Sequence, residues 1–225
     1  MSPFFSPPFI IAILIALSIH EWAHGMVAYK LGDPTAKLDG RLTVNPLAHL
    51  DPIGAVMFLM VGFGWAKPVP VNPQYFKHPK RDTMFVSLAG PFSNLVLAFL
   101  AFFLLFAINS GNVGSSAMSL LLPTQAPSLL MQVVEQILKS SIFINLALMA
   151  FNLLPIAPLD GSKILRAFIP SQHEFTYEVF MQRGPSILLI LILAGMFLGI
   201  PILSTWVFGI MSPFLNLMNF IAQML

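Results

Sequence analysis

Residues 9–32 read FIIAILIALSIHEWAHGMVAYKLG, and this stretch decides the fold. It begins as an unbroken apolar run, and it is long enough to cross a bilayer, which takes about 20 helical residues. The same run contains His20, Glu21 and His24, in the pattern His-Glu-x-x-His. Residues four apart share one face of a helix, so the two imidazoles can hold one metal ion between them, with Glu21 on the neighbouring edge.

These residue types suit hydrolysis assisted by a metal ion. Two neutral imidazoles bind zinc, the ion lowers the pKa of its water, and a carboxylate that is not a ligand takes the proton. The alternative is a chance match, or two core histidines satisfied by hydrogen bonds. Three ionisable side chains within about one helical turn are costly inside a bilayer and are functional there as a rule. We therefore favour a metal site with Glu21 as the general base.

The composition indicates a membrane protein that forms one domain over residues 1–225. It is 57% hydrophobic and 9% charged, whereas average soluble domains carry about 25% charged residues. A formal net charge of +2, with no cluster of basic residues, argues against nucleic acid as a partner. The chain has no cysteine, so a metal ion must be bound by nitrogen and oxygen atoms, which suits zinc.

The apolar runs predict an all-α polytopic membrane protein, a bundle of about five to six transmembrane helices. The runs that can cross are residues 9–32, 84–108, 140–159, 186–203 and 204–222. The last two could instead form a hairpin broken near Pro201. Residues 128–139 could form an interfacial helix, and residues 109–127 are typical of a loop. The catalytic core then covers about residues 9–166, and the C-terminal helices cover about 186–222.

A stretch near residues 38–73 does not fit a transmembrane helix. Residues 53–66 are apolar but only 14 long and contain three glycines, which favours a re-entrant segment over one that crosses. Residues 38–44 could form a short strand at an edge. Three prolines between residues 68 and 73 exclude a helix and favour extended backbone.

A catalytic zinc ion needs a third protein ligand besides two histidines. The carboxylates outside the motif are Asp33, Asp39, Asp51, Asp82, Glu135, Asp160, Glu174 and Glu178. Asp160 differs from the others because it closes an apolar run and follows Pro155 and Pro158. These prolines unwind the backbone, so the side chain of Asp160 could turn toward a neighbouring helix. Asp160 could equally begin a turn with Gly161.

Three motifs, in this order, resemble those of the site-2 protease family of intramembrane zinc metalloproteases. They are His20-Glu21-Trp22-Ala23-His24, Gly90-Pro91-Phe92-Ser93-Asn94, and Asn152-Leu153-Leu154-Pro155 leading to Leu159-Asp160-Gly161. The resemblance implies one catalytic zinc ion bound by His20, His24 and Asp160, with Glu21 as general base. It also implies substrate-backbone or oxyanion contacts for Asn94 and Asn152. The structural alternative for both amides is hydrogen bonding between helices.

The resemblance also implies a function. Residues 45–52 and 67–70 look like the compact prokaryotic branch of the family, without a PDZ-like or a regulatory nucleotide-binding domain. We expect an intramembrane zinc endopeptidase of the prokaryotic inner membrane that cleaves transmembrane protein or peptide substrates by Glu-assisted attack of zinc-bound water. The alternative is a membrane zinc-binding or zinc-transport protein, but a transporter would usually show internal repeats and polar residues along several spans.

The positions of Lys and Arg predict the orientation in the membrane. If residues 53–66 dip in and return, every one of the 11 Lys and Arg residues except Lys139 lies on the same side. This excess identifies that side as cytoplasmic. The same arrangement places His20, His24 and Asp160 near the cytoplasmic face.

Overall fold

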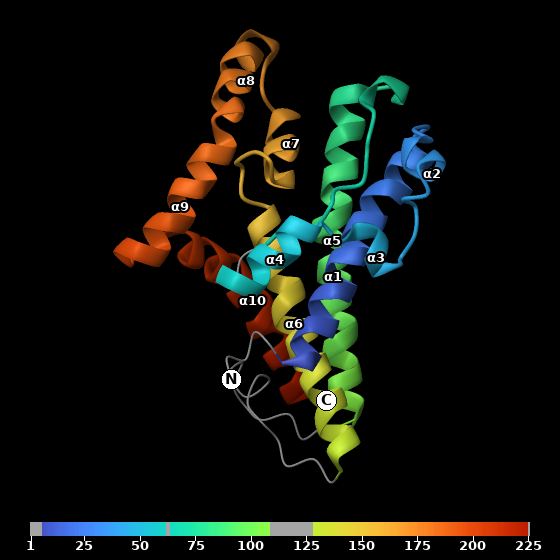
Figure 1. The fold of residues 1–225 in the computed structure, drawn as a ribbon, viewed down its shortest axis with the longest axis vertical. Coiled ribbons are helices and arrows are strands. Elements are labelled where there is room, and N and C mark those ends of the chain that lie inside the picture. Colours follow the sequence, from blue (N-terminus) through green and yellow to red (C-terminus); the bar gives the residue numbers. More distant parts are fainter. Residues whose placement is uncertain (1–5, 62–63, 109–127, 225) are drawn as a thin grey trace.

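The computed structural model describes residues 6–61, 64–108 and 128–224, and these residues are helical with no β-strand. Helices long and apolar enough to cross a membrane are α1 (Pro7–Lys30), α5 (Pro79–Ile108), α6 (Leu129–Asn152) and α10 (Ile202–Met224). A bent pair, Ser171–Gln182 with Gly184–Leu198, raises the number to five. The predicted all-α polytopic membrane protein is confirmed, with four to five candidate spans where about five to six were expected (Figure 1).

Helices α1, α5 and α6 form the centre of the bundle (Figure 1). Small residues on their facing sides, such as Ala16, Ala98 and Ala150, have no exposed surface. Small side chains allow close approach of helix backbones, which is the usual basis of helix packing in membranes. Helix α10 packs against α6 and buries Met211 and Met218 completely.

Residues 128–139 and the following apolar run form one helix, so the prediction of a separate interfacial helix is wrong. Helix α6 begins after Ser128, whose side chain accepts a hydrogen bond from the Met131 amide at 3.3 Å. Glu135 and Lys139 form a buried ion pair with an N–O distance of 2.9 Å. Because each charge has a partner, the helix carries both without interruption. The predicted loop at 109–127 lies outside the described residues.

The apolar segment after residue 50 returns to the place where it starts. Helix α4 (Pro52–Val61) has 10 residues, which is too short to cross a bilayer. Leu50 and Ala66, on either side of it, pair in an antiparallel bridge. The backbones also meet at Gly54, where an added Cβ would lie 2.2 Å from the Trp65 carbonyl oxygen. This geometry is that of the predicted re-entrant segment.

Residues 38–44 do not form the strand that the sequence suggested. The Asp33 carboxylate accepts a hydrogen bond from the Thr35 amide at 2.9 Å and starts helix α2 (Thr35–Leu38). Gly40 then takes a positive φ of 64° and turns the chain. These local contacts outweigh the strand propensity. The next helix is α3 (Pro46–His49), and the His49 ring donates from Nε2 to the Thr43 carbonyl at 2.7 Å.

Residues 65–72, here called the strap, cross over α1 without forming a helix, as the prolines require. Two contacts hold the strap in place. The Arg41 guanidinium donates to the Lys67 carbonyl at 2.7 Å, and the Asn72 amide donates to Asp33 Oδ2 at 2.6 Å. The strap leads through a short 3₁₀ helix, η2 (Pro73–Tyr75), into α5.

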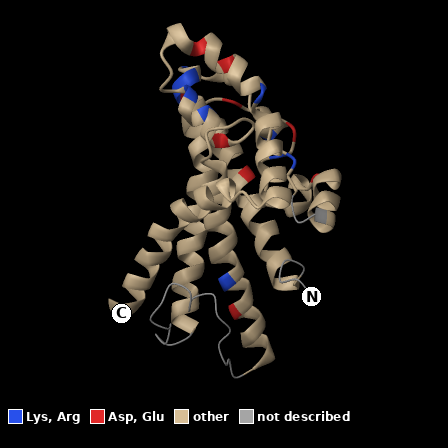
Figure 2. Ribbon diagram, turned by 90° about the vertical axis from the view of Figure 1, so that its left-hand side faces the viewer, with Lys and Arg blue, Asp and Glu red and all other residues tan. Residues whose placement is uncertain are grey.

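The chain after α6 unwinds over residues 153–159 and then forms short helices at one end of the bundle. These are α7 (Asp160–Arg166), η4 (Ser171–His173) and α8 (Glu174–Gln182). Helix α9 (Gly184–Leu198) leaves the bundle at an angle, and the chain bends at Gly199, whose φ is 66° (Figure 1). This break lies beside the predicted Pro201. Figure 2 shows that most charged residues gather at the same end as α7 and α8.

The return of α4 predicts that residues 35 and 75 face the same side of the membrane. The chain contains no cysteine, so Thr35→Cys and Tyr75→Cys would each give a single site for a membrane-impermeant thiol reagent. We expect both to be labelled from the same side in oriented vesicles. Ser128→Cys is the control. Ser128 precedes α6, at the opposite end of the helix from Asn152, and it should be labelled from the opposite side of the membrane. Labelling of positions 35 and 75 from opposite sides would contradict the re-entrant arrangement.

Candidate metal centre

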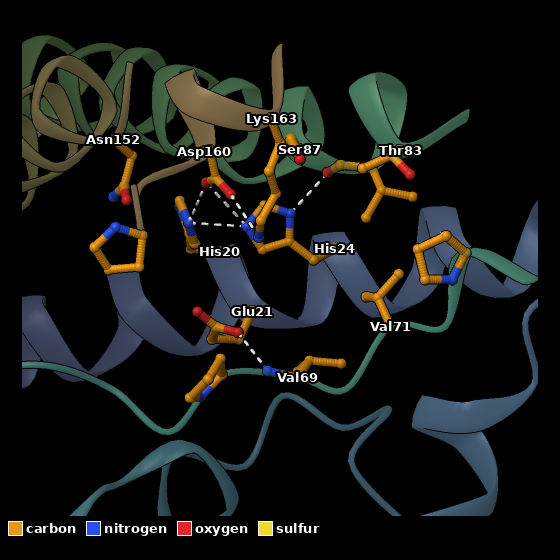
Figure 3. A pocket seen from close by; sticks show the side chains of 14 residues that line it. His20, Glu21, His24, Val69, Val71, Thr83, Ser87, Asn152, Asp160 and Lys163 are labelled. Atoms are coloured by element: carbon orange, nitrogen blue, oxygen red, sulfur yellow. Dashed lines mark hydrogen bonds and ion pairs between the residues drawn. The ribbon is translucent and has the colours of Figure 1, made fainter. Parts of the chain in front are cut away.

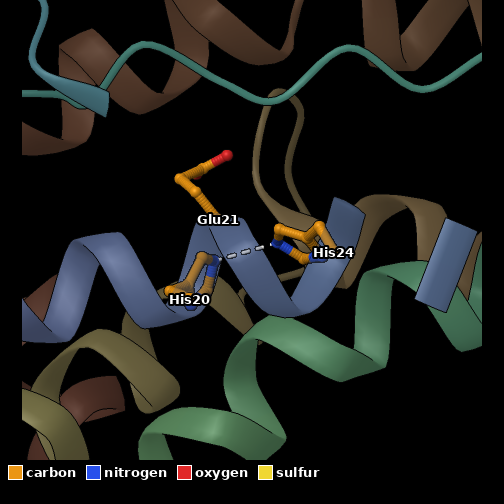
Figure 4. Close-up of side chains that lie close together, drawn as sticks. All are labelled: His20, Glu21 and His24. Carbon is orange, nitrogen blue, oxygen red and sulfur yellow. Dashed lines mark hydrogen bonds between the residues drawn. The ribbon is translucent and has the colours of Figure 1, made fainter. Parts of the chain in front are cut away.

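The two histidines of the first motif lie on one face of α1 and point inward. His20 and His24 are 4% and 8% exposed, and their Nε2 atoms are 3.0 Å apart (Figure 4). The spacing of four residues produces this proximity directly, because it is close to one helical turn. The two rings meet edge to face, with centroids 4.6 Å apart.

The unwound residues 153–159 bring Asp160 to the same point. Its Oδ2 atom lies 3.2 Å from His20 Nε2 and 3.1 Å from His24 Nε2 (Figure 3). Asp160 is therefore the carboxylate outside the motif that meets both histidines, and it also begins α7 next to Gly161. The side chain thus turns toward a neighbouring helix, as one alternative expected, and the residue begins a helix rather than the turn of the other alternative.

The three atoms have the spacing and chemistry that a zinc ion requires. Tetrahedral Zn–N bonds of about 2.0–2.1 Å separate the ligand atoms by about 3.3 Å, close to the 3.0–3.2 Å found here. Asp160 Oδ2 is buried and accepts no hydrogen bond from the described residues, which is costly unless a cation occupies the site. His24 Nδ1 donates to the Val86 carbonyl at 2.7 Å, so its Nε2 presents a lone pair.

The charge on Asp160 agrees with this role. Burial alone would raise the pKa of the Asp160 carboxyl, but without a metal ion protons on the imidazoles of His24 and His20 hold it below its ordinary value, and a zinc ion would take the place of those protons. The carboxylate is therefore negative at neutral pH. A negative oxygen among two imidazole nitrogens is a donor set that suits zinc.

Two glycines make room for the three ligand atoms. A Cβ on Gly90 would lie 2.5 Å from His24 Nε2 and 2.6 Å from His20 Nε2, so the α5 backbone presses directly on both rings. A Cβ on Gly161 would lie 2.3 Å from the Leu153 carbonyl oxygen, so the chain can fold tightly before α7. Both glycines belong to the sequence motifs, but the motifs alone did not predict this packing role. The signal for Gly90 was a Gly-Pro pair inside an apolar span.

Glu21 stands beside the three atoms on the side of the strap. One carboxylate oxygen and the ring nitrogens of His20 and His24 all lie within 4.8 Å of one another. Glu21 Oε2 accepts a hydrogen bond of 2.8 Å from the Val69 amide (Figure 3). This bond holds the carboxylate toward the strap, whereas Asp160 is within 3.2 Å of both histidines. Glu21 is therefore better placed to contact a water than to act as the third ligand.

The two predicted asparagines occupy different positions. Asn152 lines the cavity beside the histidines, and its amide donates to the Leu148 carbonyl at 3.0 Å. Asn94 is completely buried, and its Oδ1 lies 2.6 Å from His20 Nδ1, on the far side of the ring from Asp160. A substrate can therefore reach Asn152, while the expected substrate contact does not fit the position of Asn94.

Two adjoining cavities open at the site. The first has a volume of about 310 Å³ and contains His20, Glu21, His24 and Asp160 in its wall. The second has a volume of about 440 Å³ and shares His20 and Glu21 with the first. Its remaining wall is mainly apolar and includes Leu17, Leu148, Phe151, Leu188 and Ile192. The reactive groups thus lie between two cavities, of which the second has the more apolar wall.

Comparison with known proteins assigns the chain to a family. Peptidase family M50 matches residues 8–195. The chain is 44% identical over 164 residues to YwhC of Bacillus subtilis, covering 73% of this chain and 70% of YwhC. It is 28% identical over 206 residues to Rip2 of Mycobacterium tuberculosis, covering 88% of this chain and 68% of Rip2.

Both relatives are named as candidate zinc metalloproteases. No solved structure matches the chain. The family match covers most of the chain, including all three sequence motifs, and the apolar helices agree with a membrane location. The chain therefore belongs to peptidase family M50, the site-2 protease family, and is a membrane zinc metalloprotease.

Proposed function

We propose that residues 1–225 form one intramembrane endopeptidase domain that cleaves membrane-embedded proteins or peptides. His20, His24 and Asp160 would hold one zinc ion, and Glu21 would act as general base. The observation that carries the proposal is the triangle of ligand atoms, 3.0–3.2 Å on each side, with Glu21 beside it. Family membership favours proteolysis over the alternative of zinc transport.

The side chains divide the work of hydrolysis between them. When bound, zinc supplies a Lewis acid that polarises the scissile carbonyl and acidifies a water. Glu21 takes the proton of the attacking water and later passes it to the leaving amine. The Val69 amide donates a hydrogen bond of 2.8 Å to Glu21 Oε2 and so orients the carboxylate. Asn152, in the cavity wall, is placed to donate a hydrogen bond to a substrate carbonyl.

The apolar cavity next to Glu21 supports a membrane-embedded substrate. Its wall of Leu, Ile and Phe side chains suits the apolar side chains of a transmembrane segment. Such a segment must unwind before its carbonyls can react, and each unpaired polar group in lipid costs several kcal/mol in order of magnitude. The enzyme must therefore supply hydrogen bonds to the unwound substrate.

The strap offers fewer of these hydrogen bonds than its extended sequence suggests. The amides of Lys67, Val69 and Asn72 already donate to His49, Glu21 and Asp33, respectively. Proline residues at 68 and 70 have no N–H, so an added substrate strand would find Val71 as the remaining donor of residues 67–72. Pairing with the strap would thus rely mainly on its carbonyl oxygens.

We further propose that the site faces the cytoplasmic side of a prokaryotic inner membrane. The charged residues gather at the end of the bundle that carries α7 and α8 (Figure 2). Asp160 is the first residue of α7, so the ligand atoms lie toward that end. An excess of Lys and Arg marks a cytoplasmic side.

The role of Glu21 can be tested by Glu21→Gln. The amide can still accept the Val69 hydrogen bond but cannot take a proton, so the variant should keep its zinc and its fold. Peptide cleavage should fall by about 10²–10⁴-fold, the usual contribution of a general base. Zinc content and cleavage are measured together, with Asp160→Ala as the comparison that should lose both. Cleavage at the wild-type rate by Glu21→Gln would sink the mechanism.

The close approach of α5 predicts that Gly90→Ala weakens zinc binding. The new Cβ would lie within 2.6 Å of both ring nitrogens, so the ligands must move apart. We expect zinc affinity to fall by about 10–100-fold, as for other disturbances around a metal ligand. Gly209→Ala in α10 is the matched control, because nothing lies within 4 Å of its Cβ. Equal zinc affinity in the two variants would contradict the tight packing at Gly90.

Unwinding predicts a substrate preference. Substrates with Gly, Pro or Asn near the cut should be cleaved faster than variants with Leu or Ala there, because those residues unwind at lower cost. The measurement is a paired series of single-span substrates incubated with the purified protein, with and without a chelator. The control places the same substitutions at the far end of the same span. Equal rates throughout would show that unwinding does not limit cleavage.

A further inference from the structure

A line of hydrogen bonds leads from His20 across three helices. His20 Nδ1 on α1 lies 2.6 Å from Asn94 Oδ1 on α5. The Asn94 amide nitrogen donates to Asn145 Oδ1 on α6 at 2.8 Å. The Asn145 amide nitrogen in turn donates to the Ser141 carbonyl oxygen at 2.8 Å and to its hydroxyl at 3.1 Å. Asn94 and Asn145 have no exposed surface, so water cannot replace either bond.

The far end of this line sets the direction of every bond in it. The Ser141 carbonyl is only an acceptor, so Asn145 must turn its NH₂ group toward it. Asn145 then offers its oxygen to Asn94, which must answer with its own NH₂ group. Asn94 is left with its oxygen facing His20, and that oxygen can only accept. The Nδ1 atom of His20 must therefore carry the proton.

The opposite arrangement would prevent metal binding. If both amides were turned around, Asn94 would donate to His20 Nδ1, and the ring proton would move to Nε2, the atom that faces Asp160. Asn145 would then place its oxygen against the Ser141 carbonyl, leaving two buried acceptors in contact. The Ala16 carbonyl also favours the observed orientation of Asn94, but at a longer 3.3 Å.

The comparison with His24 shows what this line replaces. His24 Nδ1 reaches a backbone acceptor directly, the Val86 carbonyl, so its tautomer is fixed by the main chain. His20 faces a side-chain amide, which by itself can present either an oxygen or an NH₂ group. The tautomer of His20 therefore depends on the orientation of Asn94, which the 2.8 Å bond to Asn145 and the longer bond to the Ala16 carbonyl hold.

We propose that Asn145 is a positioning residue for zinc binding, which holds Asn94 so that His20 keeps its proton on Nδ1 and its lone pair on Nε2. The proposal rests on the proposed zinc site. Asn145 touches neither the metal ligands nor the cavity, and none of the three sequence motifs contains it. Helix α6 thereby takes part in the metal site through a residue that lies about 10 Å of helix rise before its last residue, Asn152, at roughly 1.5 Å per residue.

Zinc affinity of the full-length protein, measured by competition with a chelator, tests the proposal. Asn145→Leu keeps the size of the side chain but removes its hydrogen bonds to Asn94 and Ser141, and it should weaken zinc binding by about 10–100-fold. Ser141→Ala is the matched control, because it removes the hydroxyl and keeps the backbone carbonyl that sets the direction. It should bind zinc with wild-type affinity.

A second substitution separates positioning from general stability. Asn94→Asp gives His20 a side chain whose two oxygens both accept, so the direction no longer depends on Asn145. Adding Asn94→Asp to Asn145→Leu should therefore restore most of the lost zinc affinity. If Asn145→Leu weakened zinc binding only by loosening the bundle, the second change would not restore it, and that result would overturn the proposal.

The tautomer can also be observed without any substitution. Nitrogen-15 shifts of the His20 ring, assigned by their absence in His20→Ala, should show the proton on Nδ1 in metal-free protein at a pH where the ring is neutral. A proton on Nε2 would overturn the proposal even if Asn145→Leu fails to fold. Wild-type zinc affinity in Asn145→Leu would overturn it while leaving the zinc site intact. A wild-type protein that binds no zinc would overturn the zinc site and this proposal together.

Discussion

The atoms His20 Nε2, His24 Nε2 and Asp160 Oδ2 meet at one point, and the packing of α5 and of the turn before α7 follows from this meeting. Three polar atoms converge inside an apolar bundle, where any unsatisfied group is costly. The other ring nitrogens are therefore hydrogen-bonded within the protein. His24 Nδ1 bonds to the Val86 carbonyl, and His20 Nδ1 bonds to Asn94. Gly90 lets α5 come close enough to supply both partners. The two histidines of α1 thus account for the presence of Gly90 and Asn94 on α5.

The strap imposes a second constraint, on the carboxylate of Glu21, the proposed general base. Its sequence alternates prolines with residues that have an N–H, so Val69 is the single backbone donor over residues 68–70. That donor goes to Glu21, and the Asn72 donor goes to Asp33 at the end of α1. The strap is thus attached to Glu21 on α1 and to Asp33, three residues after α1 ends. Its position and the position of Glu21 cannot change independently.

The sequence predicted the features that depend on local spacing, but it did not predict those that depend on contacts between distant residues. His20 and His24 could be paired from their separation alone, and the prolines before Asp160 suggested an unwound turn. The strand expected at 38–44 is absent because α2 extends to Leu38 and the chain turns at Gly40, and the hydrogen bond from the Thr35 amide to Asp33 that precedes α2 is a contact that propensity does not include. The break expected near residue 139 failed because Glu135 and Lys139 neutralise each other. Asn145 carried no signal, since a lone amide in an apolar span has no spacing to the motif.

The origin of each ligand also explains how metal binding and folding are connected. His20 and His24 lie on α1, which packs against α5 and α6 in the centre of the bundle, and small buried residues keep that centre close-packed. Asp160 belongs instead to α7, beyond the unwound residues 153–159. A metal ion held by these proposed ligands would tie α7 to α1, so part of its binding energy would go into fixing that connection. The ligands on α1 are preorganised by the bundle, whereas the third ligand depends on the tight turn at Gly161, where even one methyl group would meet the Leu153 carbonyl. The geometry of the proposed metal site therefore depends on residues 153–159 through Asp160, and on helix packing through the two histidines.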